Sequence, residues 1–130
     1  FLAKYDSNTR TLHYVNAGHT PPVLISKGEV VLLKNGCTSL GWMPELPFLE
    51  IGGLCLTDEA IIFSYTDGLT EVRNSAGEEF EEKKLLDFLS KNATEGAKEL
   101  NTKLLKHIEA FRGREPWTDD ITVLTCKVFC

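Results

Sequence analysis

The most constraining feature of the sequence is the run Ala60-Ile61-Ile62-Phe63-Ser64-Tyr65, which is apolar at almost every position. Apolar residues on both sides of an extended segment are typical of a strand that is buried on both faces. The run ends at Thr66-Asp67-Gly68, which predicts a sharp turn that carries one carboxylate. We therefore expect residues 60–65 to form a strand inside the fold, with a polar group presented at its end.

Shorter strands precede this run, and two helices follow it. Alternating and β-branched residues predict strands over residues 1–5, 11–16, 23–26, 29–33, 48–51 and 121–129, with residues 34–46 irregular. Apolar residues at helical spacing predict helices around residues 80–89 and 100–111. Strands joined by short hairpins favour an antiparallel sheet with helices packed on one side, so the predicted fold class is α+β.

Composition excludes several classes of function. With 130 residues the chain is one domain, or part of one, and its formal net charge of -5 argues against a nucleic-acid binder. No apolar run approaches the roughly 18 residues that span a bilayer, so we expect no membrane segment in this chain. The four cysteines form no Cys-x-x-Cys pair, which argues against zinc and favours reduced, mostly buried thiols in a cytoplasmic protein.

Polar groups gather where predicted strands end. Gly18-His19 follows one strand, Asp67 follows the apolar run, and Asp119-Asp120 precedes the last strand. If the strands beside Asp67 and Asp119 pair antiparallel, both carboxylates come to one end of the sheet, and a divalent cation such as Mg²⁺ or Mn²⁺ would offset their repulsion. Each feature has a simpler explanation taken singly. Asp-Gly is a common turn, an Asp before a strand is often a loop cap, and His19 could hydrogen-bond the backbone.

Taken together, the motifs resemble the C-terminal half of the SpoIIE/RsbU branch of the metal-dependent (type 2C, PPM) protein serine/threonine phosphatases. The resemblance rests on Tyr14-Val15-Asn16-Ala17-Gly18-His19-Thr20-Pro21-Pro22, Leu40-Gly41, Ser64-Tyr65-Thr66-Asp67-Gly68-Leu69-Thr70-Glu71 and Asp119-Asp120-Ile121-Thr122-Val123-Leu124. It implies an antiparallel β-sandwich flanked by helices, with a metal site at one end. Residues 1–130 would be the incomplete, C-terminal part of that domain.

The resemblance also implies a site and a reaction. Asp67 and Asp119 match metal-ligand aspartates, Asp120 stands where relatives often carry Asn, and Gly68 completes the Thr-Asp-Gly motif. Gly18-His19 matches the place where distant relatives carry Gly-Asp near an accessory metal. Two Mn²⁺ or Mg²⁺ ions would activate a water, so no catalytic protein residue is expected. The implied substrate is phosphoserine or phosphothreonine on a regulatory protein of the anti-anti-sigma kind, in bacterial sigma-factor signalling.

The chain lacks the Gly-Asp-x-x-Asp and Asp-x-x-Gly-His-Gly motifs of the family's first half, since no glycine here is followed by Asp. We therefore expect an incomplete two-metal site, weak Mn²⁺ binding and little phosphatase activity in the isolated chain. Uncovered strands predict self-association as a homo-oligomer. The alternative is a degenerate, phosphatase-like regulatory module that binds a phosphoprotein without turnover.

Overall fold

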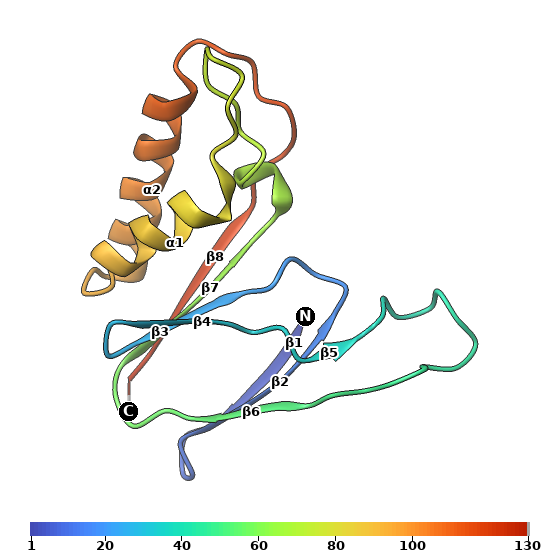
Figure 1. The fold of residues 1–130 in the computed structure, drawn as a ribbon. Coiled ribbons are helices and arrows are strands. Elements are labelled where there is room, and N and C mark those ends of the chain that lie inside the picture. Colours follow the sequence, from blue (N-terminus) through green and yellow to red (C-terminus); the bar gives the residue numbers. More distant parts are fainter. Residues whose placement is uncertain (130) are drawn as a thin grey trace.

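The structure is a computed structural model, and it describes residues 1–129 (Figure 1). The described part contains strands, two α-helices and one short 3-10 helix. Their bounds are β1 Leu2–Asp6, β2 Thr11–Ala17, β3 Val23–Ser26, β4 Glu29–Leu32, β5 Gly36–Cys37, β6 Gly52–Cys55, β7 Ala60–Tyr65, η1 Asp67–Leu69, α1 Glu81–Lys91, α2 Ala97–Arg112 and β8 Val123–Val128. None of the helices in the described part is long and apolar enough to cross a membrane.

The strands form two sheets. In the first, β2 pairs antiparallel with β1 on one edge and with β6 on the other, and its last two residues pair with β5 in parallel. In the second, the order is β4-β3-β7-β8 and every pair is antiparallel. The predicted α+β class and the antiparallel sandwich flanked by helices are therefore confirmed.

Strand β7 lies between two hydrophobic layers, as its sequence predicts. Ile61, Phe63 and Tyr65 face a core that also contains the buried side chains of α1 and α2. Ala60 and Ile62, which alternate with them, face a second core made with the first sheet. The molecule thus has three layers, with helices on one side of β7 and the first sheet on the other (Figure 1). We call the two cores the helix-side core and the sheet-side core.

Both helices bury one apolar stripe against the second sheet. Leu100, Leu104 and Ile108 follow one another at a spacing of four along α2 and are completely buried. Leu85 and Leu89 do the same on α1, whose first turn carries two glutamates that suit the helix N-terminus. The helical spacing in the sequence therefore predicted both helices correctly.

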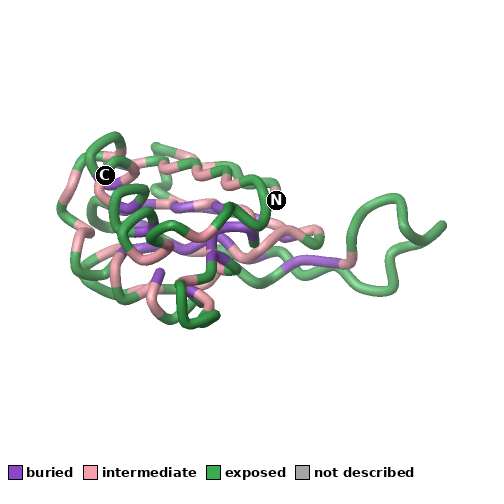
Figure 2. Tube along the Cα trace, turned by 90° about the horizontal axis from the view of Figure 1, so that it is seen from above, coloured by how far each residue is buried: buried purple, intermediate pink, exposed green. Residues whose placement is uncertain are grey.

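The segment between β5 and β6 differs from its prediction. Residues 48–51 were predicted to form a strand, which is wrong, because β6 begins only at Gly52. Gly52 fits there because a Cβ atom would lie 2.2 Å from the ring of Tyr14 on the paired strand β2. Residues 38–51 instead form a long exposed arm that extends away from the two sheets (Figure 2). Within the segment predicted to be irregular, Gly36 and Cys37 form the short strand β5.

The cysteines are free but not mostly buried. Cys37 is buried, whereas Cys55 and Cys126 are exposed, so the expectation of buried thiols is wrong for these two. Both lie on strands at the less covered side of the sandwich, which a local apolar pattern does not reveal. The fourth, Cys130, lies outside the described residues.

Candidate metal centre

The pairing of β7 with β8 brings the Thr-Asp-Gly motif beside the Asp-Asp motif. The register joins Tyr65 to Val123, and the Thr66 amide continues the ladder by donating to the Thr122 carbonyl at 3.1 Å. Asp67 leaves the end of β7 just where Asp119 and Asp120 approach the start of β8. The antiparallel pairing that the sequence analysis set as the condition for bringing both carboxylates to one end of the sheet is therefore present.

Thr66 fastens the two motifs together through its side chain. Its hydroxyl donates to the Asp120 carbonyl at 3.1 Å and accepts a hydrogen bond from the Thr122 amide at 3.0 Å. These residues are more than 50 positions apart in sequence, so the contact fixes the relative position of two loops rather than one turn. The hydroxyl of Thr66 is a positioning group that the sequence analysis did not single out.

Gly68 allows the two loops to approach closely. A Cβ atom at this position would lie 2.6 Å from the Asp120 carbonyl oxygen and 3.2 Å from the Asp119 Cβ. Its φ is not among the positive values of the described residues, so the position requires a small residue rather than a left-handed backbone. The sequence predicts a sharp turn at Gly68, whereas its structural role is to bring Asp119 against the Asp67 turn.

Asp67 and Asp119 share the same local geometry. The Gly68 amide donates to Asp67 Oδ1 at 3.1 Å, and the Asp120 amide donates to Asp119 Oδ1 at 2.7 Å. Asp67 also begins η1, in which its carbonyl accepts hydrogen bonds from the Thr70 and Glu71 amides. Both carboxylates are exposed to solvent and are hard oxygen donors, which suit Mg²⁺ or Mn²⁺.

This arrangement fits only part of a metal site. Among residues 1–129, no group of three or more histidine, cysteine, aspartate or glutamate side chains is placed to hold a metal ion. Asp120 and His19 therefore do not join Asp67 and Asp119 in a cluster of three ligands. The ligand roles of the three aspartates and the near-site role of His19 stay predictions.

His19 is held by a compact loop between β2 and β3. Asn16 donates to the His19 carbonyl at 2.8 Å and accepts from the His19 amide at 2.9 Å, and the ring Nδ1 lies 2.5 Å from the Thr20 carbonyl. Gly18 has φ of 84° and packs against Ser39, where a Cβ would clash. Asn16 is buried at 7% exposure, and it follows Leu12 and Tyr14 on the buried face of β2. A polar residue in that apolar series is the signal that could have identified its bracing role.

Tyr65 connects the base of the site to helix α1. Its side chain is buried, and its hydroxyl forms a hydrogen bond with Glu82 in the first turn of α1. Burial, the negative charge of Glu82 and this hydrogen bond raise the pKa of Tyr65 to about 12. The phenol therefore remains protonated at neutral pH and links the last residue of β7 to the first turn of α1.

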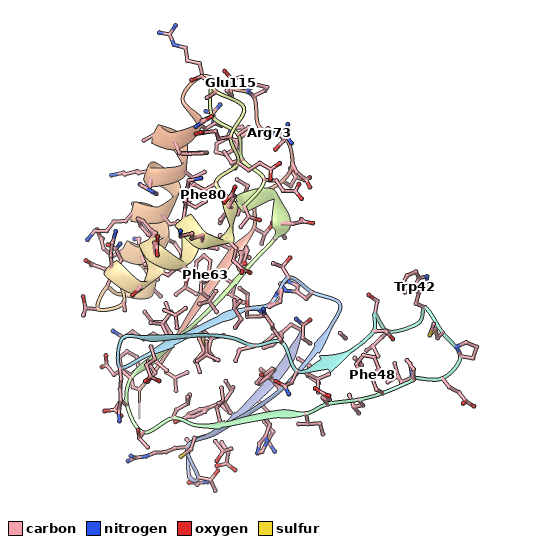
Figure 3. All side chains as sticks on the ribbon, in the orientation of Figure 1. Trp42, Phe48, Phe63, Arg73, Phe80 and Glu115 are labelled. Atoms are coloured by element: carbon pink, nitrogen blue, oxygen red, sulfur yellow. The ribbon has the colours of Figure 1, made fainter. Side chains whose placement is uncertain are left out.

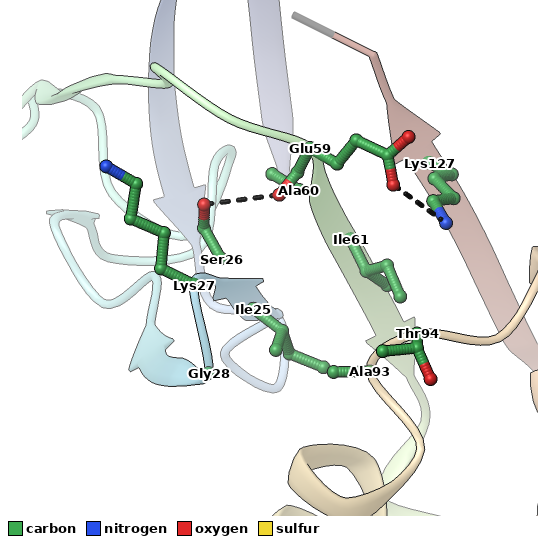
Figure 4. Close-up of a pocket in the computed structure, with 10 residues that line it drawn as sticks. All are labelled: Ile25, Ser26, Lys27, Gly28, Glu59, Ala60, Ile61, Ala93, Thr94 and Lys127. Atoms are coloured by element: carbon green, nitrogen blue, oxygen red, sulfur yellow. Dashed lines mark hydrogen bonds and ion pairs between the residues drawn. The ribbon is translucent and has the colours of Figure 1, made fainter.

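A separate cavity lies at the other end of β7. It has a volume of about 380 Å³ and is lined by residues around Ala60, at the start of that strand (Figure 4). Its charged groups are already engaged, since Lys127 pairs with Glu59 at 3.1 Å and Ser26 donates to the Glu59 carbonyl. The cavity is therefore separate from the Asp67 and Asp119 carboxylates.

Comparison with solved structures identifies the class of the fold. The SiaA-PP2C domain of Pseudomonas aeruginosa superposes with a TM-score of 0.81 at 22% identity over 95% of this chain and 48% of that chain. The phosphatase domain of SpoIIE from Bacillus subtilis gives a TM-score of 0.71 at 16% identity, covering 99% of this chain and 57% of that one. The fold is therefore that of PP2C-type phosphatase domains, and the chain spans about half the length of these two.

Sequence comparison assigns the family. The model of the Stage II sporulation protein E (SpoIIE) family matches residues 1–129, so the chain belongs to the SpoIIE family. Protein IcfG of Synechocystis sp. is 31% identical over 128 residues, which are 95% of this chain but only 19% of that protein. The resemblance to SpoIIE/RsbU-type phosphatase domains that the motifs indicated is confirmed.

Proposed function

We propose that this chain is the C-terminal half of a metal-dependent phosphatase domain that hydrolyses phosphoserine or phosphothreonine on a regulatory protein. The observation that carries this proposal is the placement of Asp119 against the Asp67 turn, made possible by Gly68. Two carboxylates held at one end of a sandwich, in a chain of the SpoIIE family, are the partial ligand set of such an enzyme.

In this proposal Asp67 and Asp119 hold Mn²⁺ or Mg²⁺ through their free oxygen atoms. Backbone amides bind one oxygen of each carboxylate and would leave the other oxygen available to a cation. Thr66 keeps the two loops in register. When bound, metal ions at such a site lower the pKa of a coordinated water and offset charge on the phosphoryl oxygens. The chain itself then needs no nucleophilic side chain.

The remaining ligands would come from outside this chain. Two aspartates give too little charge for a two-metal site, and residues 1–129 provide no third ligand beside them. We propose that a preceding segment of the parent protein supplies further carboxylates, since the solved phosphatase domains are about twice as long. The isolated chain would accordingly bind Mn²⁺ weakly and turn over little substrate.

The proposed substrate is a small cytoplasmic phosphoprotein of the anti-anti-sigma kind. Support comes from the family and from a structural neighbour that contains the RsbU and RsbW domains of a Mycobacterium tuberculosis protein, which superposes with a TM-score of 0.72 at 22% identity over 95% of this chain and 34% of that one.

The decisive experiment measures hydrolysis of p-nitrophenyl phosphate with Mn²⁺. This chain would be compared with a version extended upstream through the missing half, each with and without Asp67→Asn. Asp58→Asn is the matched control, because Asp58 pairs with Lys27 at 2.8 Å in the loop before the opposite end of β7. We expect turnover only in the extended protein, lost in Asp67→Asn and kept in Asp58→Asn. Equal activity in the Asp67→Asn variant would contradict the proposal.

The second candidate is a regulatory module that binds a phosphoprotein without turnover. It is favoured by the lack of a three-ligand group in the described residues. Absence of activity in both the chain and its extended version, together with binding of a phosphoprotein, would establish it.

A further inference from the structure

A pocket of about 310 Å³ opens beside the candidate metal centre, and the proposed chemistry assigns no role to its apolar side chains. We call it the Trp117 pocket. It is lined by Leu105, Glu109, Trp117, Asp119, Asp120 and Ile121. Leu105 and Glu109 lie one turn apart on the outer face of α2, and the other residues belong to the loop that leads into β8. The pocket therefore lies between helix α2 and the Asp-Asp motif.

Trp117 is fixed in place although about half of its surface is exposed. The guanidinium of Arg112 lies 4.3 Å from the centre of the indole ring, in a cation–π contact. Arg112 also donates a hydrogen bond to the Glu115 carbonyl, which ties the loop to the end of α2. Trp117 is 47% exposed and Leu105 is 40% exposed, so two large apolar side chains meet solvent here on rigid supports.

The pocket shares two of its walls with the candidate metal centre. Asp119 and Asp120 line the pocket, and the same residues contact Gly68 beside Asp67. A phosphorylated residue placed at Asp67 and Asp119 would thus have its neighbours in sequence within reach of Trp117. This continuity connects the pocket to substrate binding rather than to an unrelated surface.

We propose that the Trp117 pocket receives an apolar side chain of the phosphoprotein, located within three residues of the phosphorylated serine or threonine. The assignment rests on the proposed function. Walls formed by Leu105, Trp117 and Ile121 favour an aliphatic group, because burial of apolar surface drives its binding. The rim is acidic, and Glu109 has no ion-pair partner among residues 1–129, so an aspartate or glutamate at the same substrate position is disfavoured.

Binding of phosphopeptides to the 130-residue chain tests this proposal. In the presence of Mg²⁺, phosphoserine peptides carrying Leu or Asp at each of the three positions on either side are titrated against ¹⁵N-labelled protein. At one position we expect the Leu peptide to shift the indole N–H signal of Trp117 and to bind about tenfold more tightly than its Asp counterpart. Trp117→Ala should remove that preference, and Trp117→Phe should retain most of it.

Trp42→Ala is the matched control, because Trp42 is the other tryptophan and is 80% exposed on the arm. This variant should keep the Leu preference. No shift of the Trp117 signal with any Leu peptide, or equal affinity for Leu and Asp peptides, would overturn the pocket. If the unphosphorylated Leu peptide binds as tightly as the phosphorylated one, the pocket stands and the phosphatase proposal loses support. Hydrolysis of p-nitrophenyl phosphate, which carries no side chain, tests that proposal separately.

Discussion

The two faces of β7 differ in their side chains and in how completely they are covered, with Ile61, Phe63 and Tyr65 on the helix side and Ala60, Ile62 and Ser64 on the sheet side. On the helix side, Phe63 is completely buried and lies near Phe80, under α1 and α2 (Figure 3). On the sheet side, Ile62 and Ser64 are only partly buried and line an apolar groove of about 270 Å³ between β1 and β8. Both faces carry apolar side chains that are stabilised by burial, but only the helix side is completely covered. An apolar pattern in the sequence therefore predicts that a face of the strand is buried, but it does not show which element covers that face.

The arm is a second region whose apolar side chains are not covered. Seven large apolar side chains on residues 38–51 are exposed, among them Trp42 at 80% and Phe48 at 54% (Figure 3). They lie on the same side of the molecule as the first sheet, away from the helices (Figure 1). A surface of this kind marks an interaction site or a tendency to associate. In the described part of the chain, the helix side is therefore the more completely covered side, and the sheet side exposes more apolar surface.

The prediction with the largest expected effect compares a leucine-to-alanine substitution in each of the two cores. Leu104→Ala, in the helix-side core, should lower the free energy of unfolding by about 3–5 kcal/mol. Leu12→Ala, in the sheet-side core, should cost about 2–3 kcal/mol, because Leu12 also lines the open groove and the site can relax. Urea unfolding monitored by circular dichroism gives both values. An equal or larger loss for Leu12→Ala would show that the sheet-side core relaxes no more readily than the helix-side core.

Thr66→Val tests the connection between the loops of the candidate metal centre. The change removes two hydrogen bonds, so we expect a loss of about 1–2 kcal/mol in the free energy of unfolding. Faster hydrogen exchange of the Thr122 amide should accompany it. Thr102→Val is the control, because that hydroxyl only bonds a carbonyl within α2. Unchanged exchange at Thr122 would mean that the backbone pairing holds the loops without Thr66.

The pH dependence of the free energy of unfolding tests what the Tyr65 phenol contributes to the helix-side core. Because the pKa of Tyr65 is raised to about 12 in the folded chain, its contribution to stability is complete below pH 10 and is lost as the pH rises through 12. Tyr65→Phe should cost about 1 kcal/mol at pH 7 through the lost hydrogen bond. The variant should also show a shallower fall in stability between pH 10 and 12. Parallel curves for the two proteins would refute this linkage.

The smallest effect on stability is expected at the arm. Trp42→Ser with Phe48→Ser should change the free energy of unfolding by less than about 0.5 kcal/mol, since both side chains are exposed. The double variant should nevertheless shift the sedimentation profile at high concentration toward the monomer. An unchanged profile would direct attention to the edges of β1 and β8 as the surface through which copies associate.

Local patterns in the sequence were enough to find most elements. The alternation in residues 11–16 and the helical spacing of Leu100, Leu104 and Ile108 predicted β2 and α2 because both signals arise within one element. The strand predicted at residues 48–51 failed because pairing depends on a distant partner. Gly52 meets Tyr14 of β2, and this contact sets where β6 begins.

The candidate site likewise has features that the sequence predicts and features that only the structure shows. The motifs pointed to Asp67 and Asp119 as candidates, and the antiparallel pairing on which their proximity depended is present in the structure. The hydroxyl of Thr66 and the bracing by Asn16 were not predicted, because each acts between segments whose distance the sequence does not encode locally. The Trp117 pocket was not predicted either, because its walls come from α2 and from the loop before β8.

The sequence alone determined the kinds of elements, their order, the family and the two aspartates, because periodicity and motifs are properties of neighbouring residues. Only the tertiary structure decided that Gly68 is needed for a close approach, that one face of β7 is covered and the other left open, and that residues 38–51 project as an arm. Those features depend on which surfaces meet in space. Burial and backbone pairing are determined by contacts between residues that are far apart in the chain.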